Sequence, residues 1–141
     1  MNTQPIRTAV VTGGHGYDVM NFQRLFHNLD GVEAYVQHMD DFAISSEEVR
    51  DSYEAVVFYT MLMDGPHDEG QPGYAGKPKS ALGHLGETQQ GIFVLHHALL
   101  AYPQWSVWNE IVGMEDRSFG AHQGKSLHVE IADSAHPITQ D

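Results

Sequence analysis

The first half of the chain alternates short apolar runs with polar or amphipathic segments. Residues 8–12 form a β-branched run that stops at a glycine pair, and residues 20–29 then carry apolar side chains at helical spacing. Residues 32–37 and 53–61 are further apolar runs, and the second is apolar at nearly every position, which is typical of a strand buried on both faces. Two serines and two glutamates at 45–48 predict the start of a short helix between them.

The second half continues this alternation after a long loop. Residues 64–76 contain four glycines and two prolines among polar residues, so we expect a loop that covers a binding pocket. Beyond the loop the pattern predicts a helix at 80–90, a strand at 91–96, helices at 98–102 and 104–112, and a strand at 126–132. In the last of these, Leu127, Val129 and Ile131 alternate with polar residues.

Strands that alternate with helices in this way predict an α/β fold. We expect one domain over residues 1–141, built as a three-layer sandwich around a mainly parallel sheet of about five strands, as in flavodoxin-like proteins. Ligands of such sheets bind beyond the carboxyl ends of the strands, so the residues that follow each strand are the candidates for a site. A short sheet also leaves an open edge, which is a template for pairing, and we therefore expect a homo-oligomer.

Composition excludes several classes of function. With 41% hydrophobic and 18% charged residues and no long apolar run, the chain is typical of a soluble protein, and residues 1–8 do not resemble a secretory signal, so we expect a cytoplasmic location. The net charge of −12 disfavours nucleic acid and anionic membranes as partners. The absence of cysteine excludes disulfides, thiolate zinc sites and a cysteine nucleophile, whereas ten histidines remain.

The first candidate site is the segment 13–18, which follows the first predicted strand. Its backbone amides can bind an anion, although the glycine spacing does not match the dinucleotide fingerprint and glycine also serves simply to form the tight turn. Polar and titratable side chains in this loop favour a functional interpretation. We therefore take His15 as a candidate catalytic residue and Gly14, Tyr17 and Asp18 as candidates for binding substrate.

The second candidate is the pair His96 and His97 at the end of the strand predicted over 91–96. A strand that passes directly into a helix raises its junction residue above the sheet, as in a nucleophile elbow. Imidazoles at this place can act as acid and base near neutral pH or bind a metal. Because adjacent strand residues point to opposite faces, one of the two can instead be a hydrogen-bonded core histidine.

Further candidates follow the tryptophan-containing helix. Arg117 and His122 lie in a glycine-containing loop, where the guanidinium can bind a carboxylate or a sugar hydroxyl, or pair with a neighbouring surface carboxylate. Trp105 is a candidate platform for a sugar ring, although aromatic residues at this spacing also fill cores. His15, His97 and His122 are the set that would bind a divalent metal such as zinc, although they lack a short ligand spacing. We interpret the other histidines as surface or loop residues: His27, His38, His67, His84, His128 and His136.

The chain resembles the trehalose-utilisation (ThuA-like) family in five segments that occur in the family's order. These segments are Val11–Asp18, Tyr53–Val57, Gly91–Ala98, Arg117–His122 and Asp133–Ile138. The Gly-Gly-His motif at the start and the Leu-His-His-Ala elbow together are the most distinctive part of the match. The resemblance implies the class I glutamine amidotransferase-like fold without the elbow cysteine, and hence a protein that is not a glutamine amidotransferase. The family domain normally continues through further strands after the turn at His136–Ile138.

The resemblance implies a role in carbohydrate metabolism, linked with oxidised disaccharides of the keto type. The leading hypothesis is an enzyme that acts on a sugar or keto-sugar, with His96 or His97 as acid and base, His15 assisting, and Arg117 and His122 orienting the substrate. Two alternatives remain open. One is a noncatalytic sugar-binding or assembly subunit, and the other is a metal-dependent hydrolase or isomerase with histidine ligands.

Overall fold

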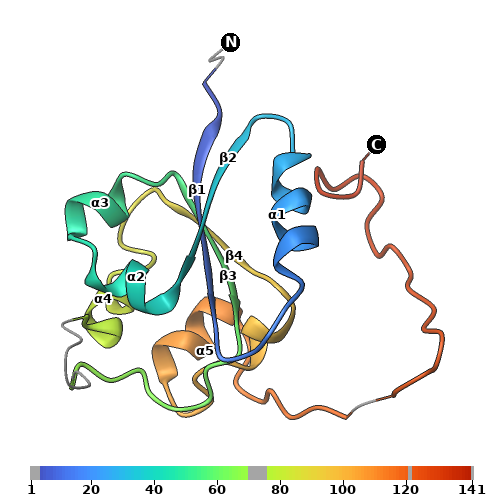
Figure 1. Cartoon of the computed structure of the whole chain (residues 1–141). Coiled ribbons are helices and arrows are strands. Elements are labelled where there is room, and N and C mark those ends of the chain that lie inside the picture. Colours follow the sequence, from blue (N-terminus) through green and yellow to red (C-terminus); the bar gives the residue numbers. More distant parts are fainter. Residues whose placement is uncertain (1–3, 70–75, 121, 141) are drawn as a thin grey trace.

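A four-stranded, all-parallel sheet forms the centre of the fold (Figure 1). The computed structural model describes residues 4–69, 76–120 and 122–140. The strands are β1 (Ile6–Gly13), β2 (Val32–His38), β3 (Ala55–Thr60) and β4 (Gly91–Val94), in the spatial order β2-β1-β3-β4. This order is compatible with a flavodoxin-like fold, and it confirms the predicted α/β class with a parallel sheet.

Helices lie on both faces of the sheet. They are α1 (Val19–His27), α2 (Met39–Ile44), α3 (Glu47–Asp51), α4 (Pro78–Gly83), the 3₁₀ helix η1 (His96–Leu100) and α5 (Ser106–Val112). Figure 1 shows α1 on one side of the sheet and α2, α3 and α4 on the other. Side chains cap several helix starts: Asp18 accepts a hydrogen bond from the Asn21 amide at 3.0 Å, and Ser46 accepts one from the Val49 amide at 3.3 Å.

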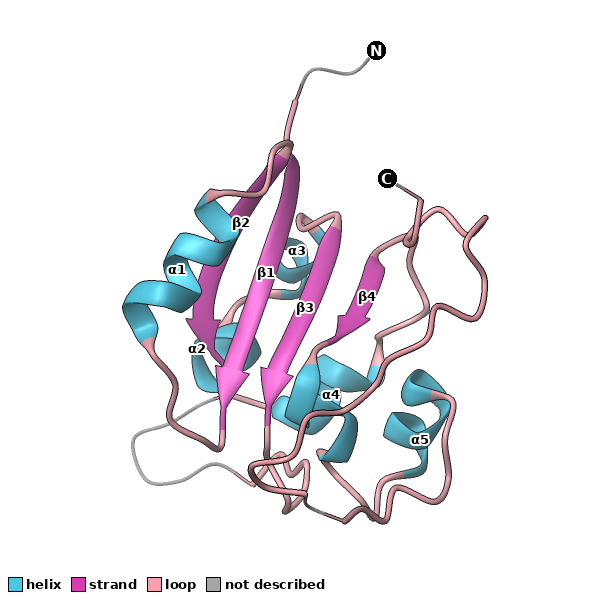
Figure 2. Cartoon of the chain, turned by 90° about the vertical axis from the view of Figure 1, so that its right-hand side faces the viewer, coloured by secondary structure: helices cyan, strands magenta, loops and turns pink. Residues whose placement is uncertain are grey.

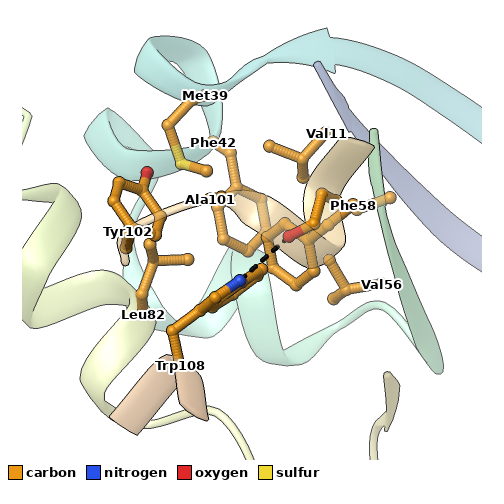
Figure 3. Close-up of a cluster of buried hydrophobic side chains, with 11 residues drawn as sticks. Val11, Met39, Phe42, Val56, Phe58, Leu82, Ala101, Tyr102 and Trp108 are labelled. Carbon is orange, nitrogen blue, oxygen red and sulfur yellow. Dashed lines mark hydrogen bonds between the residues drawn. The ribbon is translucent and has the colours of Figure 1, made fainter. Parts of the chain in front are cut away.

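The main core lies between the sheet and α2, α4, η1 and α5 (Figure 3). Alternate residues of β1 and β3 point into it, and the buried set is Ala9, Val11, Met39, Phe42, Val56, Phe58, Leu82, Ala98, Ala101, Tyr102 and Trp108. The Trp108 ring stands edge-on to Phe58 at 5.1 Å, and its Nε1 donates a hydrogen bond to the Ala98 carbonyl at 3.0 Å. This single side chain therefore joins α5, η1 and the sheet.

The opposite face of the sheet is covered only in part. Figure 2 shows α1 in front of β2 and beside β1, whereas no helix lies in front of β3 and β4 on this side. Accordingly Val10 of β1 is fully buried, Val57 of β3 is half-buried, and Phe93 of β4 is 54% exposed. The apolar character of residues 53–61 predicted burial on both faces, but within β3 only one face is fully buried.

Some local predictions were wrong. The predicted helix at 80–90 ends at Gly83, and α2 was not predicted at all, because His38 ends β2 and at once caps a helix by accepting a hydrogen bond from the Asp40 amide at 3.2 Å. Part of the loop predicted at 64–76 lies outside the described residues.

The predicted strand at 126–132 is also absent, so the described residues form four strands rather than about five. This segment keeps its apolar alternation, but residues 122–140 are all exposed and the segment has no neighbouring strand. A β-strand is completed by hydrogen bonds to a partner, which alternation alone does not supply.

Replacing Phe58 by alanine tests the main core. Because the ring is fully buried against Trp108 and Phe42, we expect the free energy of unfolding to fall by about 3–5 kcal/mol in urea denaturation. The matched control is Phe93→Ala on the uncovered face, for which we expect a loss below about 1 kcal/mol. Equal losses for the two variants would contradict this description of the core.

Candidate functional site

The loop after β1 lies against the end of β3. Gly14 has φ +81°, and a Cβ atom at this position would overlap the carbonyl oxygen of Met61. Only glycine allows both this backbone conformation and this contact. The approach brings His15, the next residue, to the carboxyl end of β3, where its ring lies edge-on to Tyr59 with 4.6 Å between ring centroids.

The strand β4 ends in the abrupt turn that the sequence predicted. His96 follows it with φ +55°, a left-handed conformation that residues other than glycine seldom adopt, and η1 begins at the same residue. Such strain is maintained only where the surrounding structure fixes it, and it is found preferentially at functional sites. The turn presents His96 to solvent and leaves His97 half-buried.

Three imidazole rings meet beyond the carboxyl ends of β1, β3 and β4. The ring centroids of His15 and His97 are 5.2 Å apart, and those of His96 and His97 are 3.8 Å apart. The centroid of the Tyr59 ring is 6.2 Å from that of His96. The structure thus brings together the three candidate catalytic residues that the sequence placed in two distant motifs.

Aromatic rings extend this cluster along one side. Tyr17 lies edge-on to Tyr59 at 5.8 Å, and Phe22 of α1 stacks on Tyr59 at 4.6 Å. Tyr17 was predicted as a binding residue, but Tyr59 and Phe22 were not. The signal for Tyr59 was its place near the end of β3, on the face opposite to the buried Phe58.

Two ring nitrogens in the cluster have no partner within the described structure. His15 Nδ1 lies 3.1 Å from the Gly16 carbonyl oxygen, which can only accept, so Nδ1 carries the proton and Nε2 of the neutral ring presents a lone pair. This Nε2 atom is buried without a hydrogen-bond partner, and so is His97 Nδ1. Buried polar atoms are normally hydrogen-bonded, so an unsatisfied one needs an explanation, and a catalytic role is one such explanation.

The pKa of His97 is lowered from its ordinary value. Burial is the main cause, and the neighbouring imidazoles of His96 and His15 add to it by disfavouring a further positive charge. His97 is therefore neutral at pH 7 and available as a proton acceptor. Because the unfolded chain takes up this proton at a higher pH than the folded one, the contribution of His97 to stability falls as the pH drops below about 6.5.

Asp18 and Arg117 make hydrogen bonds that stabilise the fold. Asp18 caps α1, and hydrogen bonds from Asn21 lower the pKa of its carboxyl. Arg117 is buried, and its terminal nitrogens donate to the carbonyls of Leu99, Ala101 and Tyr102 and to Oδ1 of Asn109, at 3.1, 2.5, 3.1 and 2.6 Å. These bonds tie the end of η1 to α5 and replace both predicted interactions of Arg117, the substrate contact and the surface ion pair.

The remaining predicted site residues, Trp105 and His122, do not take part in the ring contacts that form the histidine cluster. Trp105 precedes α5 and packs edge-on against Tyr102 at 5.9 Å, and His122 is exposed in the segment 122–140. Among the residues with described positions, no group of three His, Cys, Asp or Glu side chains could hold a metal ion. The zinc set of His15, His97 and His122 is therefore not assembled.

One histidine interpreted as a surface residue lies closer to the candidate site than expected. His38 ends β2, beside β1 in the sheet, and a Cβ atom at Gly13 would lie 3.2 Å from its Nε2 atom. Its Nδ1 atom is 3.3 Å from an Asp40 carboxylate oxygen. Its position after a strand was the signal that sequence reasoning did not use.

Comparison with known proteins identifies no relative. The chain matches no family model, no curated protein and no solved structure. Across the described ranges, no helix is both long and apolar enough to span a bilayer. The geometry of the histidine cluster is therefore the basis for the functional interpretation.

Replacing Gly14 by alanine tests the close approach of the first loop. We expect the free energy of unfolding to fall by about 1–3 kcal/mol, because the new methyl group meets the Met61 carbonyl in a left-handed backbone conformation. Gly16→Ala is the matched control, since a Cβ atom at Gly16 would have no neighbour within 4 Å and the residue has no positive φ. Urea denaturation measures both, and unchanged stability in the Gly14 variant would contradict the described packing.

Titration of the histidine side chains by NMR tests the electrostatics of the site. We expect the pKa of His97 to lie below 6.5 and to rise in His96→Asn, because that variant removes a neighbouring positive charge. The control is His84, whose pKa is raised by Glu87 and should not change in the same variant. A His97 pKa above 6.5 would contradict the burial of this ring.

Proposed function

We propose that the protein is a ThuA-like enzyme of carbohydrate metabolism that acts on a sugar or keto-disaccharide by histidine acid–base chemistry. The observation that carries the proposal is the pair of buried, unpartnered nitrogens, His15 Nε2 and His97 Nδ1, in rings 5.2 Å apart beyond the carboxyl ends of the strands. A substrate group that bonds to these nitrogens would satisfy both.

The roles of the histidines follow from their surroundings. His97, held neutral by its lowered pKa, accepts a proton from the carbon next to the substrate carbonyl. The electron pair of that C–H bond forms a carbon–carbon double bond while the π electron pair of the carbonyl moves to its oxygen, and this oxygen takes a proton from a ring nitrogen of His96. His15, whose Nδ1 proton is bonded to the Gly16 carbonyl, accepts a hydrogen bond from a substrate hydroxyl at Nε2. The return of the proton to the double bond completes an isomerisation or an exchange with solvent.

The walls of the site favour an uncharged sugar as the substrate. The rings of Tyr17, Phe22 and Tyr59 form a continuous aromatic surface beside the imidazoles, and such surfaces accept the C–H faces of sugar rings. The net charge of −12 disfavours phosphorylated or polyanionic substrates. Arg117 and Trp105 are not substrate contacts in this proposal, because both are engaged within the fold.

We propose in addition that the chain belongs to the class I glutamine amidotransferase-like branch of flavodoxin-like folds. The support is the strained turn at His96 directly after β4, where the resemblance implies the cysteine of amidotransferases. Since the chain contains no cysteine, amide transfer from glutamine through a thiolate is excluded.

Turnover in deuterated water tests this function. The purified protein is incubated with a keto-disaccharide, binding is measured by calorimetry, and deuterium at the carbon next to the carbonyl is measured by mass spectrometry. We expect deuterium incorporation that falls by about 10²–10⁴-fold in His97→Gln, because the proton acceptor is lost, with binding reduced much less. His128→Gln, an exposed residue outside the cluster, is the control and should keep the full rate.

The outcomes separate the competing functions. Binding without deuterium incorporation or product would refute the enzyme and favour a noncatalytic sugar-binding subunit. Failure of any keto-disaccharide to bind would refute the substrate class as well.

A further inference from the structure

A pocket apart from the histidine cluster lies against the end of η1. Its walls come from the loop after β3, from η1 and from the segment after α5, and its volume is about 260 Å³. None of the three clustered imidazoles lines it. Pockets for drug-sized ligands have volumes of about 300–1,000 Å³, so this pocket suits a smaller molecule.

Arg117 forms part of the wall and carries a charge that no carboxylate compensates. The residue is only 9% exposed, and its four hydrogen bonds go to neutral oxygens. The ion pairs found among the described residues all join a histidine to a carboxylate, so none includes Arg117. A buried charge is normally paired, because its removal from water is costly. An anionic group of a ligand would supply the missing partner.

One nitrogen of this guanidinium has no role in the fold. The two terminal nitrogens hold η1, whereas Nε is buried and has no hydrogen-bond partner in the described structure. A carboxylate accepts a charge-assisted hydrogen bond from such a donor, which is stronger than a bond to a neutral oxygen. This contact differs from the substrate contact predicted from the sequence, because it involves Nε alone and a pocket outside the histidine cluster.

Glu115 gives the same pocket an opposite charge. Its side chain is exposed, lines the pocket and makes no ion pair with Arg117. With the net charge of −12, this carboxylate disfavours a ligand that carries only negative charge. A ligand with an ammonium group beside its carboxylate would pair with both residues and stay neutral overall.

The remaining wall is mainly apolar. Met63 and Phe119 are 45% and 67% exposed, and Leu100 is half-buried. An apolar group that covers these side chains is stabilised by the removal of their surface from water. The pocket therefore combines a positive group, a negative group and an apolar surface within the space of a small molecule.

We propose that this pocket binds a zwitterionic amino acid with an apolar side chain. The carboxylate of the ligand accepts a hydrogen bond from Arg117 Nε, and its ammonium group donates to the Glu115 carboxylate. The apolar side chain packs against Met63, Leu100 and Phe119. This inference is independent of the proposed function, because the pocket shares no residue with the histidine cluster.

Calorimetric titration of the full chain with three matched compounds tests the proposal. L-leucine carries both charges, isocaproate lacks the ammonium group, and isoamylamine lacks the carboxylate. We expect L-leucine to bind at least about tenfold more tightly than either analogue, because each analogue leaves one charged group of the pocket without its hydrogen bond. Equal affinity for all three compounds, or no binding of L-leucine at millimolar concentration, would overturn the proposal.

The variant Glu115→Gln separates the two ends of the ligand. Because this residue is exposed, we expect the fold to be kept, the affinity for L-leucine to fall at least about tenfold, and the affinity for isocaproate not to fall. The matched control is Glu130→Gln, an exposed carboxylate outside the pocket, which should leave leucine binding unchanged. Equal leucine affinity in the wild type and in Glu115→Gln would refute the proposal.

NMR of the wild type locates the ligand without a change at Arg117, whose replacement would also release η1. The Nε–H resonance of Arg117 should shift when L-leucine is added, and the ring resonances of His97 should not. A shift confined to the histidine rings would assign L-leucine to the histidine cluster and overturn the proposal.

Discussion

The candidate site depends on one contact, the approach of the loop after β1 to the end of β3. The Met61 amide donates to the Gly13 carbonyl at 2.9 Å, which continues the pairing of the two strands beyond the sheet, and Gly14 then lies directly against the Met61–Leu62 peptide. Any side chain at Gly14 would separate these backbones. Because they touch, His15 reaches Tyr59 and the imidazoles that follow β4, and residues from three strands form one cluster.

A second constraint comes from the protein interior and fixes the elbow, the turn from β4 into η1 at His96. The helix η1 is a single short 3₁₀ segment, and several carbonyls at and after its end lack partners within it. Arg117, in the segment after α5, donates to the carbonyls of Leu99, Ala101 and Tyr102. Trp108 of α5 donates to the Ala98 carbonyl inside η1, which also accepts from the Ala101 amide. The strained backbone of His96 is thus supported by packing and hydrogen bonds of residues that are distant from the imidazoles.

Much of the fold could be predicted from local pattern, because β1, β2, β3 and α1 each have a clear period and clear ends. The elbow could be predicted for a similar reason, since a strand that runs directly into a helix leaves a visible junction at His96. The partners of Arg117 could not be predicted, because the carbonyls that hold it lie about one helix earlier in the chain, whereas its sequence neighbours are carboxylates. Tyr59 was missed because a run in which nearly every residue is apolar does not show which of its side chains face the site. The segment 126–132 was assigned as a strand because alternating apolar and polar residues do not show whether a neighbouring strand is present to pair with it.

The hydrogen bonds of Arg117 determine how the anchoring of the elbow responds to salt and to pH. An ion pair weakens when dissolved salt screens it or when its carboxylate takes up a proton. Arg117 instead donates to neutral carbonyl and amide oxygens in a buried setting. The anchoring of the elbow is therefore largely insensitive to ionic strength and to mild acidification.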